Sequence, residues 1–478
     1  MRIEETVRIT SLGNDGEGVG ELPTGKKIFV PGALPGEICR VSLEEEKKRF
    51  ALGKLVEIEK PSPFRTGKSD VPGANLIHLS YDKQLEYKED KVRSCLCRIG
   101  KIDDTVLDKV MHPVIPSNKM FNYRNHTQYK ISNAVICASE EGTGQPLPVT
   151  ESPLEYASLT RIRKVFEDIL RDAPTDIFCG MVLRGSERTS EALVELVSDS
   201  PLPHEELITA AGDYIRKTET VEKIRKAVPE MSLRGITLRI SNSAADKRTR
   251  SGKRVILTGE DFYEETMCGC TFRIKAGAFF QVNIPQAEKL YAEASSGISN
   301  AKTVWDLYCG TGSIGLSCIG KDQELIGIDC VSRAIESAKI NAKLSGIEAT
   351  FLVRDIGRSD LTRDDLKRPD AVITDPPRKG MDIGFVNKLI NIGPDIISYV
   401  SCDPATMARD LSLLTGRGDY EILSVTPVDM FPQTSHVECV TLLQRMSNTR
   451  ERTITPDVEM EDYHRIKNRT EVTADATE

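Results

Sequence analysis

Short runs of alternating apolar and polar residues fill the first sixty positions of the chain. The runs read VRITSL, VGEL, KKIFV, GEICRVSLEEE and FALGKLVEIEK, and turn sequences such as Gly13-Asn-Asp-Gly16 separate them. Such alternation is typical of strands with one buried face. Short strands joined by short turns predict a small closed β-barrel over residues 1–60, and Pro61 and Pro63 mark a linker after it.

The middle of the chain mixes helical and strand-like patterns. Residues 81–98 carry apolar residues at a spacing of three to four, which predicts a helix. The runs MVLRG, EALVELV, GITLRIS and RVILTG predict strands, and helices are expected at 158–171 and 204–217. We therefore expect a central α+β domain over residues 61–275. Its part near 80–115 is a candidate to pack with the C-terminal domain instead.

A regular alternation of strand and helix begins at Thr303. The apolar runs TVWDLY, ELIGID, ATFLVRD, DAVITD and IISYVS alternate with helical patterns, among them 333–344 and 382–392. This order predicts a doubly wound parallel α/β sheet over residues 276–446, with ligands at the carboxyl ends of its strands. Residues 447–478 are polar and lack apolar periodicity, so we expect a disordered tail.

Length and composition agree with this division. The chain of 478 residues is long enough for about three domains. Apolar residues make up 39% of it, and no apolar run approaches the ~18 residues of a membrane span. The segment MRIEETVRIT carries acids and lacks the apolar core of a secretory signal, which predicts a cytoplasmic protein without a membrane partner. The net charge of −8 argues against a general nucleic-acid binder, although binding depends on local patches such as Lys247–Arg254.

The cysteine and histidine pattern does not indicate a metal site. The twelve cysteines are scattered, the close pairs Cys95/Cys97 and Cys268/Cys270 have C-x-C spacing, and the six histidines lie far apart. Zinc sites usually combine paired C-x-x-C units or nearby histidines. We expect no bound metal.

The stretch DLYCGTGSIGL, residues 306–316, is a strong ligand-binding signal. Gly310, Gly312 and Gly315 form a G-x-G-x-x-G turn between a strand and a helix, and Asp329 ends the following strand. Glycines let the backbone approach a nucleotide-like ligand, and the acid can bind ribose hydroxyls. The turn alone fits a nicotinamide dinucleotide as well as S-adenosylmethionine.

Three later residues favour methyl transfer. Asp375 ends the strand DAVITD, Cys402 follows the strand IISYVS, and Glu438 begins a final apolar strand. Carbon 5 of a uracil becomes nucleophilic only after a thiolate adds to carbon 6, and a base must then remove the carbon-5 proton so that the thiolate can leave. Cys402 and Glu438 supply this thiol and this base, for which a hydride-transfer enzyme has no use.

Together these stretches resemble the uracil-5 RNA methyltransferase family. The resemblance reaches to about Leu443 and rests on GAFFQVN (277–283), DLYCGTGSIGL (306–316), DPPRKG (375–380), YVSCDPATMARDL (399–411) and PVDMFPQTSHVECV (427–440). It implies a multi-domain fold with an N-terminal β-barrel of the OB-fold/TRAM kind that binds RNA, a central α+β domain and a C-terminal α/β Rossmann-like methyltransferase domain.

The resemblance also implies roles for individual residues. Cys402 is the expected nucleophile and Glu438 the expected proton acceptor. Contacts with S-adenosylmethionine are expected at Gln281, Tyr308, Asp329 and Asp375, at Gly310 and Gly312, and, where the match is weaker, at Ser313 and Asp355. Asp403 follows Cys402 where asparagine is usual. Because another carboxylate would raise the pKa of the thiol, we expect Asp403 to turn away or to be hydrogen-bonded.

One departure concerns the iron–sulfur cluster that many relatives carry. Its first three cysteines, in a C-x5-C-x2-C pattern, precede the stretch HLSY. Thr66, Pro72 and Asn75 stand at those places here, and Ser152 is expected at the fourth. Without these thiolates we expect no iron–sulfur cluster.

Other functions remain open at this point. A nicotinamide-dependent dehydrogenase fits the glycine turn, and a catalytically silent RNA-binding protein fits the fold. If the protein is a methyltransferase, we expect it to be a monomer that modifies a specific uridine in structured RNA. We expect this RNA to be 23S ribosomal RNA, with uridine 54 of the transfer RNA T-loop as the alternative. Lys26, Lys27 and the run Lys247–Arg254 are the expected phosphate contacts, and Phe279 and Phe280 are either core residues or a stacking surface for a base.

Overall fold

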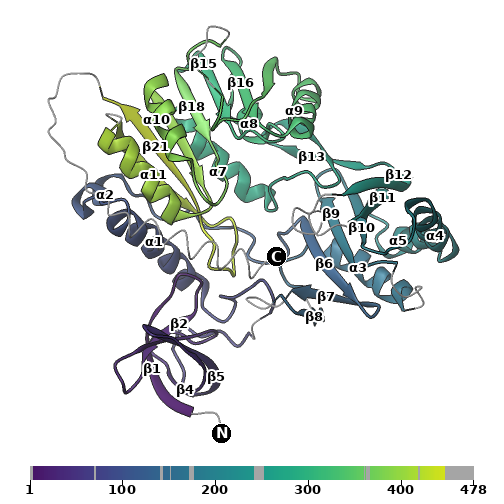
Figure 1. The fold of residues 1–478 in the computed structure, drawn as a ribbon, viewed down its shortest axis with the longest axis horizontal. Helices are drawn as coiled ribbons and strands as arrows, with labels where there is room; N and C mark the ends of the chain where they lie inside the picture. Colours follow the sequence, from purple (N-terminus) through teal and green to yellow (C-terminus); the bar gives the residue numbers. More distant parts are fainter. Residues whose placement is uncertain are drawn as a thin grey trace.

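The computed structural model describes residues 4–68, 71–139, 144–150, 152–171, 177–241, 252–359, 361, 366–417 and 420–446. Figure 1 shows the barrel below helix α1 (Tyr81–Arg98), with the C-terminal sheet above it and the central sheet to the right. The predicted disordered tail and residues 247–251 of the basic run lie outside the described residues.

The N-terminal strands close into a barrel, as predicted. They hydrogen-bond in the order β1-β2-β3-β5-β4, and β4 pairs back onto β1. Val7 and Ile9 of β1 and Val41 of β4 point inward and are buried, which is the alternation expected of strands around a core. The strands are β1 (Glu4–Leu12), β2 (Gly18–Glu21), β3 (Lys27–Val30), β4 (Ile38–Glu46) and β5 (Phe50–Lys60).

The central domain is a seven-stranded sheet with helices packed on it. The strand order is β12-β11-β10-β9-β6-β7-β8, in which β10 and β11 run parallel and the other neighbours antiparallel. Ile162, Phe166 and Leu207 of the helices share one apolar core with the strands. The elements are β6 (His126–Ser132), β7 (Val135–Ser139), β8 (Pro146–Pro148), α3 (Ala157–Leu170), β9 (Gly180–Ser186), β10 (Glu191–Ser198), α4 (His204–Lys217), α5 (Thr220–Ala227), β11 (Ser232–Ile240) and β12 (Lys253–Gly259).

The C-terminal sheet is doubly wound. Its order is β17-β16-β15-β18-β19-β21-β20, in which the first five strands are parallel and β21 is antiparallel to both of its neighbours, β19 and β20. The chain order reverses between β15 and β18, which is where such sheets bind ligands. The strands are β15 (Thr303–Leu307), β16 (Glu324–Asp329), β17 (Ala349–Val353), β18 (Ala371–Thr374), β19 (Ile396–Ser401), β20 (Tyr420–Val428) and β21 (Glu438–Arg445).

Helices cover both faces of this sheet. Val304 faces the core formed with α7, α8, α9 and the hairpin β13–β14, whereas Trp305 and Leu307 face the core formed with α10, α11 and α1. Helix α1 therefore packs on the C-terminal sheet, although the central domain follows it in sequence. The elements are α2 (Asp104–Val110), β13 (Phe262–Met267), β14 (Cys270–Lys275), α7 (Ile284–Ser296), α8 (Ser313–Cys318), α9 (Ser332–Leu344), α10 (Ile383–Ile392) and α11 (Pro404–Arg417).

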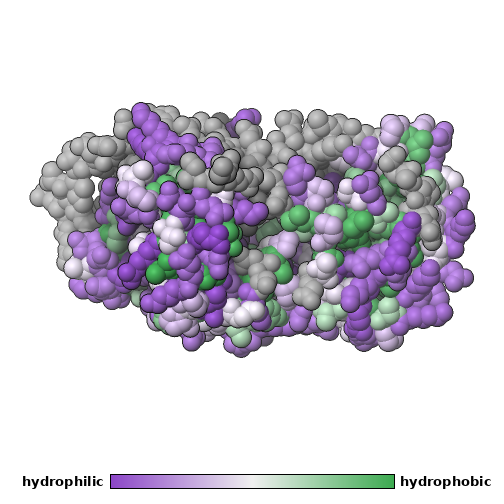
Figure 2. Space-filling model, turned by 90° about the horizontal axis from the view of Figure 1, so that it is seen from below, coloured by the Kyte–Doolittle hydropathy of each residue, from purple (hydrophilic) through white to green (hydrophobic). Residues whose placement is uncertain are grey.

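The face seen from below in Figure 2 is mostly hydrophilic, and hydrophobic residues form smaller areas on it. None of the described helices is both long and apolar enough to cross a membrane.

Candidate active site

The carboxyl ends of four parallel strands bring the predicted chemistry to one edge of the sheet. Tyr308 and the glycine turn follow β15, Asp329 ends β16, Asp375 follows β18 and Cys402 follows β19. Parallel strands end at the same edge, so residues far apart in the sequence become neighbours there.

Glu438 reaches the same edge from an antiparallel strand. Cys439 pairs with Ser401 across β21 and β19, which puts Glu438 beside Cys402. Burial, followed by the charges of Glu438 and Asp375, raises the pKa of the Cys402 thiol to about 12. The thiol and the two carboxyl groups form one electrostatic cluster, in which the thiol is protonated at neutral pH.

Both carboxyl groups of this cluster resist ionisation. Glu438 is 7% exposed, and burial together with the charge of Asp375 raises its pKa. Burial also raises the pKa of Asp375. Arg378, on the exposed turn after Asp375, lowers the pKa of both Cys402 and Glu438. Neighbouring groups with raised pKa values are typical of acid–base sites.

Asp403 is hydrogen-bonded, as the sequence analysis expects. Its Oδ1 accepts the N–H groups of Ala405 and Thr406 at 2.9 and 3.0 Å and thereby caps helix α11. Its charge still raises the pKa of Cys402, after the larger effects of burial, Glu438 and Asp375.

The glycine turn is built around Asp306 and Asp329. Gly315 N–H donates to Asp306 Oδ2 at 3.0 Å, and a Cβ at this glycine would lie only 2.6 Å from the same oxygen. Gly312 begins α8 with φ 80°, a conformation that glycine adopts without strain. Gly310 N–H donates to Asp329 Oδ2 at 3.0 Å, and no described atom lies within 4 Å of the place where a Gly310 Cβ would stand. The turn thus borders open space that a nucleotide-like ligand can fill.

Tyr291 of α7 joins two of the predicted cofactor residues. Its hydroxyl lies 3.2 Å from Ser313 Oγ and also hydrogen-bonds Gln281. The ring is buried, and burial raises the pKa of the hydroxyl well above its ordinary value. Gln281 is held in turn through its main-chain oxygen, which accepts from Asn125 Nδ2 at 3.0 Å.

Tyr308 and Asp355 are two further predicted cofactor residues. Tyr308 has φ 61°, which is uncommon outside glycine, and its ring packs edge-on against Phe385 at 6.2 Å between centroids. Burial, followed by the charges of Asp410, Asp382 and Asp355, raises the pKa of the Tyr308 hydroxyl. Asp355 Oδ1 accepts the N–H of Gly357 at 3.0 Å, so part of this carboxylate closes a local turn.

Three polar residues at the site were missed by the sequence analysis: Asp306, Tyr291 and Asn283. Asp306 is 1% exposed, and burial, with smaller effects from Asp375 and Asp329, raises its pKa to about 8. Asn283 Oδ1 is buried and has no hydrogen-bond partner among the described residues. Asp306 lies inside the stretch DLYCGTGSIGL and Asn283 inside GAFFQVN, and their place in these two stretches is the sequence signal that could have identified them.

The two phenylalanines of GAFFQVN differ in exposure. Phe280 is 2% exposed and packs on Phe272, with 5.3 Å between ring centroids. Phe279 is 74% exposed, two residues from Gln281. Phe280 is therefore a core residue, and Phe279 offers an aromatic face to solvent.

Three of the four places of the family's cluster ligands, Thr66, Asn75 and Ser152, hold hydrogen-bonded polar residues, and the fourth is Pro72. Thr66 Oγ1 donates to Ile77 O at 2.8 Å, and Asn75 Nδ2 donates to Asp15 O at 2.6 Å. Within the described part of the chain, no three His, Cys, Asp or Glu side chains come together in a way that could hold a metal ion.

Comparison with known proteins agrees with this chemistry. Residues 246–446 match the tRNA (uracil-5-)-methyltransferase family model, and residues 3–56 match the TRAM domain. An uncharacterized RNA methyltransferase of Listeria innocua is 33% identical over 465 residues, which cover 91% of this chain and 96% of the relative. One from Caldanaerobacter subterraneus is 34% identical over 460 residues, covering 92% and 98%. The chain belongs to the RNA (uracil-5-)-methyltransferase family.

A solved structure shows a similar fold over most of the chain. The tRNA (uracil-54, C5)-methyltransferase of Pyrococcus abyssi, in complex with S-adenosyl-L-homocysteine, superposes with a TM-score of 0.71 at 26% identity and covers 92% of this chain and 99% of its own. Membership of this family confirms the expected enzyme class, an S-adenosylmethionine-dependent RNA (uracil-5-)-methyltransferase.

Proposed function

We propose that the protein methylates carbon 5 of one uridine in a structured RNA through a covalent bond between Cys402 and the uracil. The observation that carries the proposal is the cluster of Cys402, Glu438 and Asp375 beside the glycine turn. S-adenosylmethionine supplies the electrophilic methyl group. The residues proposed to hold it are Gln281, Tyr308, Gly310, Gly312, Ser313, Asp329, Asp355 and Asp375.

Cys402 must lose its proton as its sulfur adds to carbon 6 of the uracil. Burial and the nearby carboxyl groups raise the pKa of the thiol to about 12, so a carboxylate has to accept its proton, and Arg378 favours the resulting thiolate. Asp375 is the proposed acceptor, because Glu438 must stay deprotonated for the later step. The S–C6 bond forms, the ring becomes an enolate, and carbon 5 takes up the methyl group. Glu438 then removes the carbon-5 proton, the C5–C6 double bond re-forms and the S–C6 bond breaks. A carboxylate with a raised pKa is the stronger base for this step.

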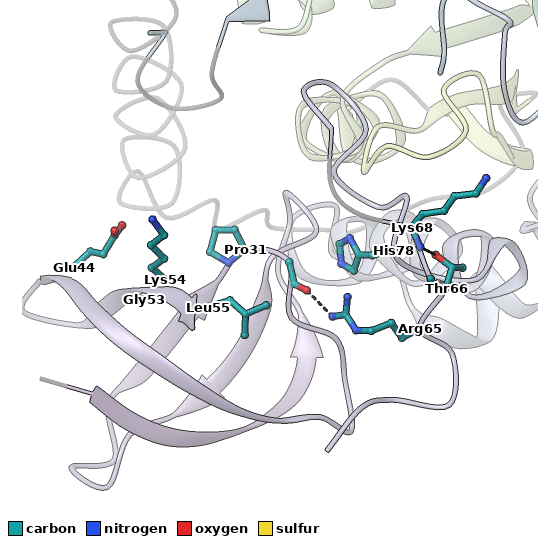
Figure 3. Close-up of a pocket in the computed structure, with 11 residues that line it drawn as sticks. Pro31, Glu44, Gly53, Lys54, Leu55, Arg65, Thr66, Lys68 and His78 are labelled. Carbon is teal, nitrogen blue, oxygen red and sulfur yellow. Dashed lines mark hydrogen bonds between the residues drawn. The ribbon is translucent and has the colours of Figure 1, made fainter. Parts of the chain in front are cut away.

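A groove between the barrel and the segment after it is suited to hold RNA away from the reacting base. Its cavity of about 530 Å³ lies between the barrel, where residues 53–55 of β5 line it, and residues 65–68 and 78. Figure 3 shows Lys54 and Lys68 on opposite sides of it, and the Lys68 ammonium group lies 3.5 Å from the centre of the Phe121 ring. The ammonium groups of these two lysines can contact the phosphates of a single strand.

The expected phosphate contacts on the barrel are less free than the sequence suggested. Lys26 forms an ion pair with Glu46, and Lys27 forms one with Glu21. We therefore place the main RNA contacts of the barrel at the groove and not at these two lysines. Exposed Phe279 is the proposed stacking surface next to the target base.

The substrate we propose is 23S ribosomal RNA, acted on by a monomer whose barrel (1–60) and central domain (61–275) grip the RNA while residues 276–446 carry the chemistry. The groove supports this choice, because it extends the contact beyond one small loop. The transfer RNA T-loop uridine is a second candidate, because the Pyrococcus abyssi enzyme is a tRNA (uracil-54, C5)-methyltransferase.

Tritium release from RNA labelled at carbon 5 of uridine tests both the covalent mechanism and the identity of the RNA substrate. Wild-type protein should release tritium. Separate reactions with ribosomal RNA and with transfer RNA transcripts show which of the two is the substrate. Cys402→Ala should bind S-adenosylhomocysteine normally but give neither adduct nor product. Glu438→Gln should accumulate a protein–RNA adduct that survives a denaturing gel. Turnover by Cys402→Ala would overturn the covalent mechanism, and release from transfer RNA alone would overturn the ribosomal assignment.

A further inference from the structure

The loop of residues 429–437 sets the position of the proposed base. It joins β20 to β21, and Glu438 is the first residue of β21. The loop is not relaxed, because Gln433 has φ 69°, in a region that side chains other than glycine rarely adopt. Such a conformation persists only where the surroundings hold it.

Helix α1 holds the first half of the loop. Gln84 is buried; its Oε1 accepts Gln433 N–H at 2.9 Å and its Nε2 donates to Gln433 Oε1 at 2.9 Å. Lys88 forms a fully buried ion pair with Asp429 and donates to Phe431 O at 3.0 Å. These side chains fix main-chain groups of the strained turn itself.

The second half of the loop is tied to the N-terminal barrel. Asn75 accepts Ser435 N–H at 3.0 Å, and its Nδ2 lies 3.1 Å from Ser435 Oγ and 2.6 Å from Asp15 O in the barrel. Lys91 Nζ donates to Ser435 O at 3.0 Å and to Asn14 O at 2.7 Å. The N–H, carbonyl and hydroxyl of Ser435 are thus all engaged by two side chains that also grip the barrel.

The barrel turn 13–16 has little room to move against these ties. The Tyr87 hydroxyl lies 2.8 and 2.7 Å from the carbonyl oxygens of Gly13 and Asn14. A Cβ at Gly16 would stand 3.4 Å from Ser435 Cβ, so the turn and the loop are in direct contact.

We propose that Asn75 and Lys91 are positioning residues, which join the barrel turn 13–16 to the loop 429–437 and so place Glu438 for removal of the carbon-5 proton. The inference rests on the proposed function, in which Glu438 is the base. Proton transfer requires donor and acceptor within hydrogen-bond reach, so a small displacement of the loop slows this step. The ties touch neither the glycine turn nor the groove, so the cofactor and RNA affinities should stay almost unchanged.

The test compares Asn75→Ala, Lys91→Met and Lys91→Arg with wild type. The first two should lower kcat about tenfold, while the RNA KM and the Kd for S-adenosylhomocysteine change less than about threefold. Both should also accumulate part of the denaturation-resistant adduct that marks a slow proton removal. Lys91→Arg keeps a donor at this place and should restore most of the rate. Exposed Asn300 and Lys223 provide matched controls, Asn300→Ala and Lys223→Met, which should behave as wild type.

Lys54→Met in the groove gives the contrasting signature, a raised RNA KM with no adduct. The same signature in Asn75→Ala and Lys91→Met would overturn the positioning role and make both residues RNA contacts. An unchanged kcat in both would overturn it as well. If Asn75→Ala loses S-adenosylhomocysteine binding through misfolding, the pair Lys91→Met and Lys91→Arg decides. A wild-type protein that releases no tritium from either RNA would instead overturn the proposed function.

Discussion

Replacing Gly315 by alanine tests the close approach on which the cofactor turn depends. The new Cβ would lie 2.6 Å from Asp306 Oδ2 and 3.0 Å from Asp306 Cβ. Ordinary contacts of this kind are about 3.5 Å, so α8 has to move away from β15 by about 1 Å. Asp306 is 1% exposed and cannot turn into water, and the movement also lengthens its 3.0 Å hydrogen bond from Gly315 N–H. Overpacking of this kind costs about 1–3 kcal/mol.

The displacement acts directly on the turn that holds the cofactor. We expect the Kd for S-adenosylhomocysteine, measured by titration calorimetry, to rise by about tenfold, which corresponds to ~1.4 kcal/mol. The melting temperature should fall by about 2–12 °C, taking about 2–4 °C per kcal/mol for a domain of this size.

Gly212→Ala is the matched control on helix α4. No described atom lies within 4 Å of its Cβ position, so alanine should fit and stabilise the helix by up to ~1 kcal/mol. Its effect on S-adenosylhomocysteine binding should be nil. Equal affinity and melting temperature for Gly315→Ala and wild type would refute the steric reasoning, and so would a fall in stability for Gly212→Ala.

Four further outcomes are expected. Lys88→Met should destabilise the protein by about 3–5 kcal/mol in urea unfolding, because it leaves Asp429 as an unpaired buried carboxylate, and adding Asp429→Asn should recover most of the loss. The single-turnover rate should rise from about pH 6 to about pH 9, because burial and the charge of Asp375 raise the pKa of Glu438 and this group acts in deprotonated form; a flat or falling profile would contradict this. Phe279→Ala should raise the RNA KM by about 5- to 100-fold if one base stacks on the ring, with cofactor affinity as the unchanged control. Protein purified without oxygen should contain no stoichiometric iron by elemental analysis, and several iron atoms per chain would disprove the expectation.

The elements that the sequence predicted well have a strong local pattern. Strands β9 to β12 and β15 to β19 are dominated by apolar residues, and helices α3, α4 and α9 have a clear apolar stripe. Strands β6 to β8 were missed, because His126–Ser132 carries polar residues on both sides and Pro146–Pro148 is exposed. Their pairing to β9 and to one another is a tertiary event that the local pattern does not encode.

The same distinction applies to the active site. Asp329, Asp375 and Cys402 could be located because each follows an apolar strand, and the strand order then brings them together. In the sequence, Lys88 resembles an exposed lysine of a helix. It is buried because it forms an ion pair with Asp429, which lies 341 residues further along the chain. The pairing of Lys26 with Glu46 is non-local in the same way, and it changes which lysines of the barrel are free for RNA.

These ties mean that the barrel is not a removable RNA-binding module. Deletion of residues 1–60 would take away the carbonyl oxygens of Asn14 and Asp15, which Lys91 and Asn75 bind. It would also remove Glu37, the buried partner of Arg65 at 2.6 Å. Loss of activity after such a deletion could then arise from a displaced Glu438 as readily as from lost RNA contacts. Single substitutions separate the two causes. Replacing a lysine of the groove should lower the RNA affinity, whereas replacing Asn75 or Lys91 should slow the removal of the carbon-5 proton by Glu438.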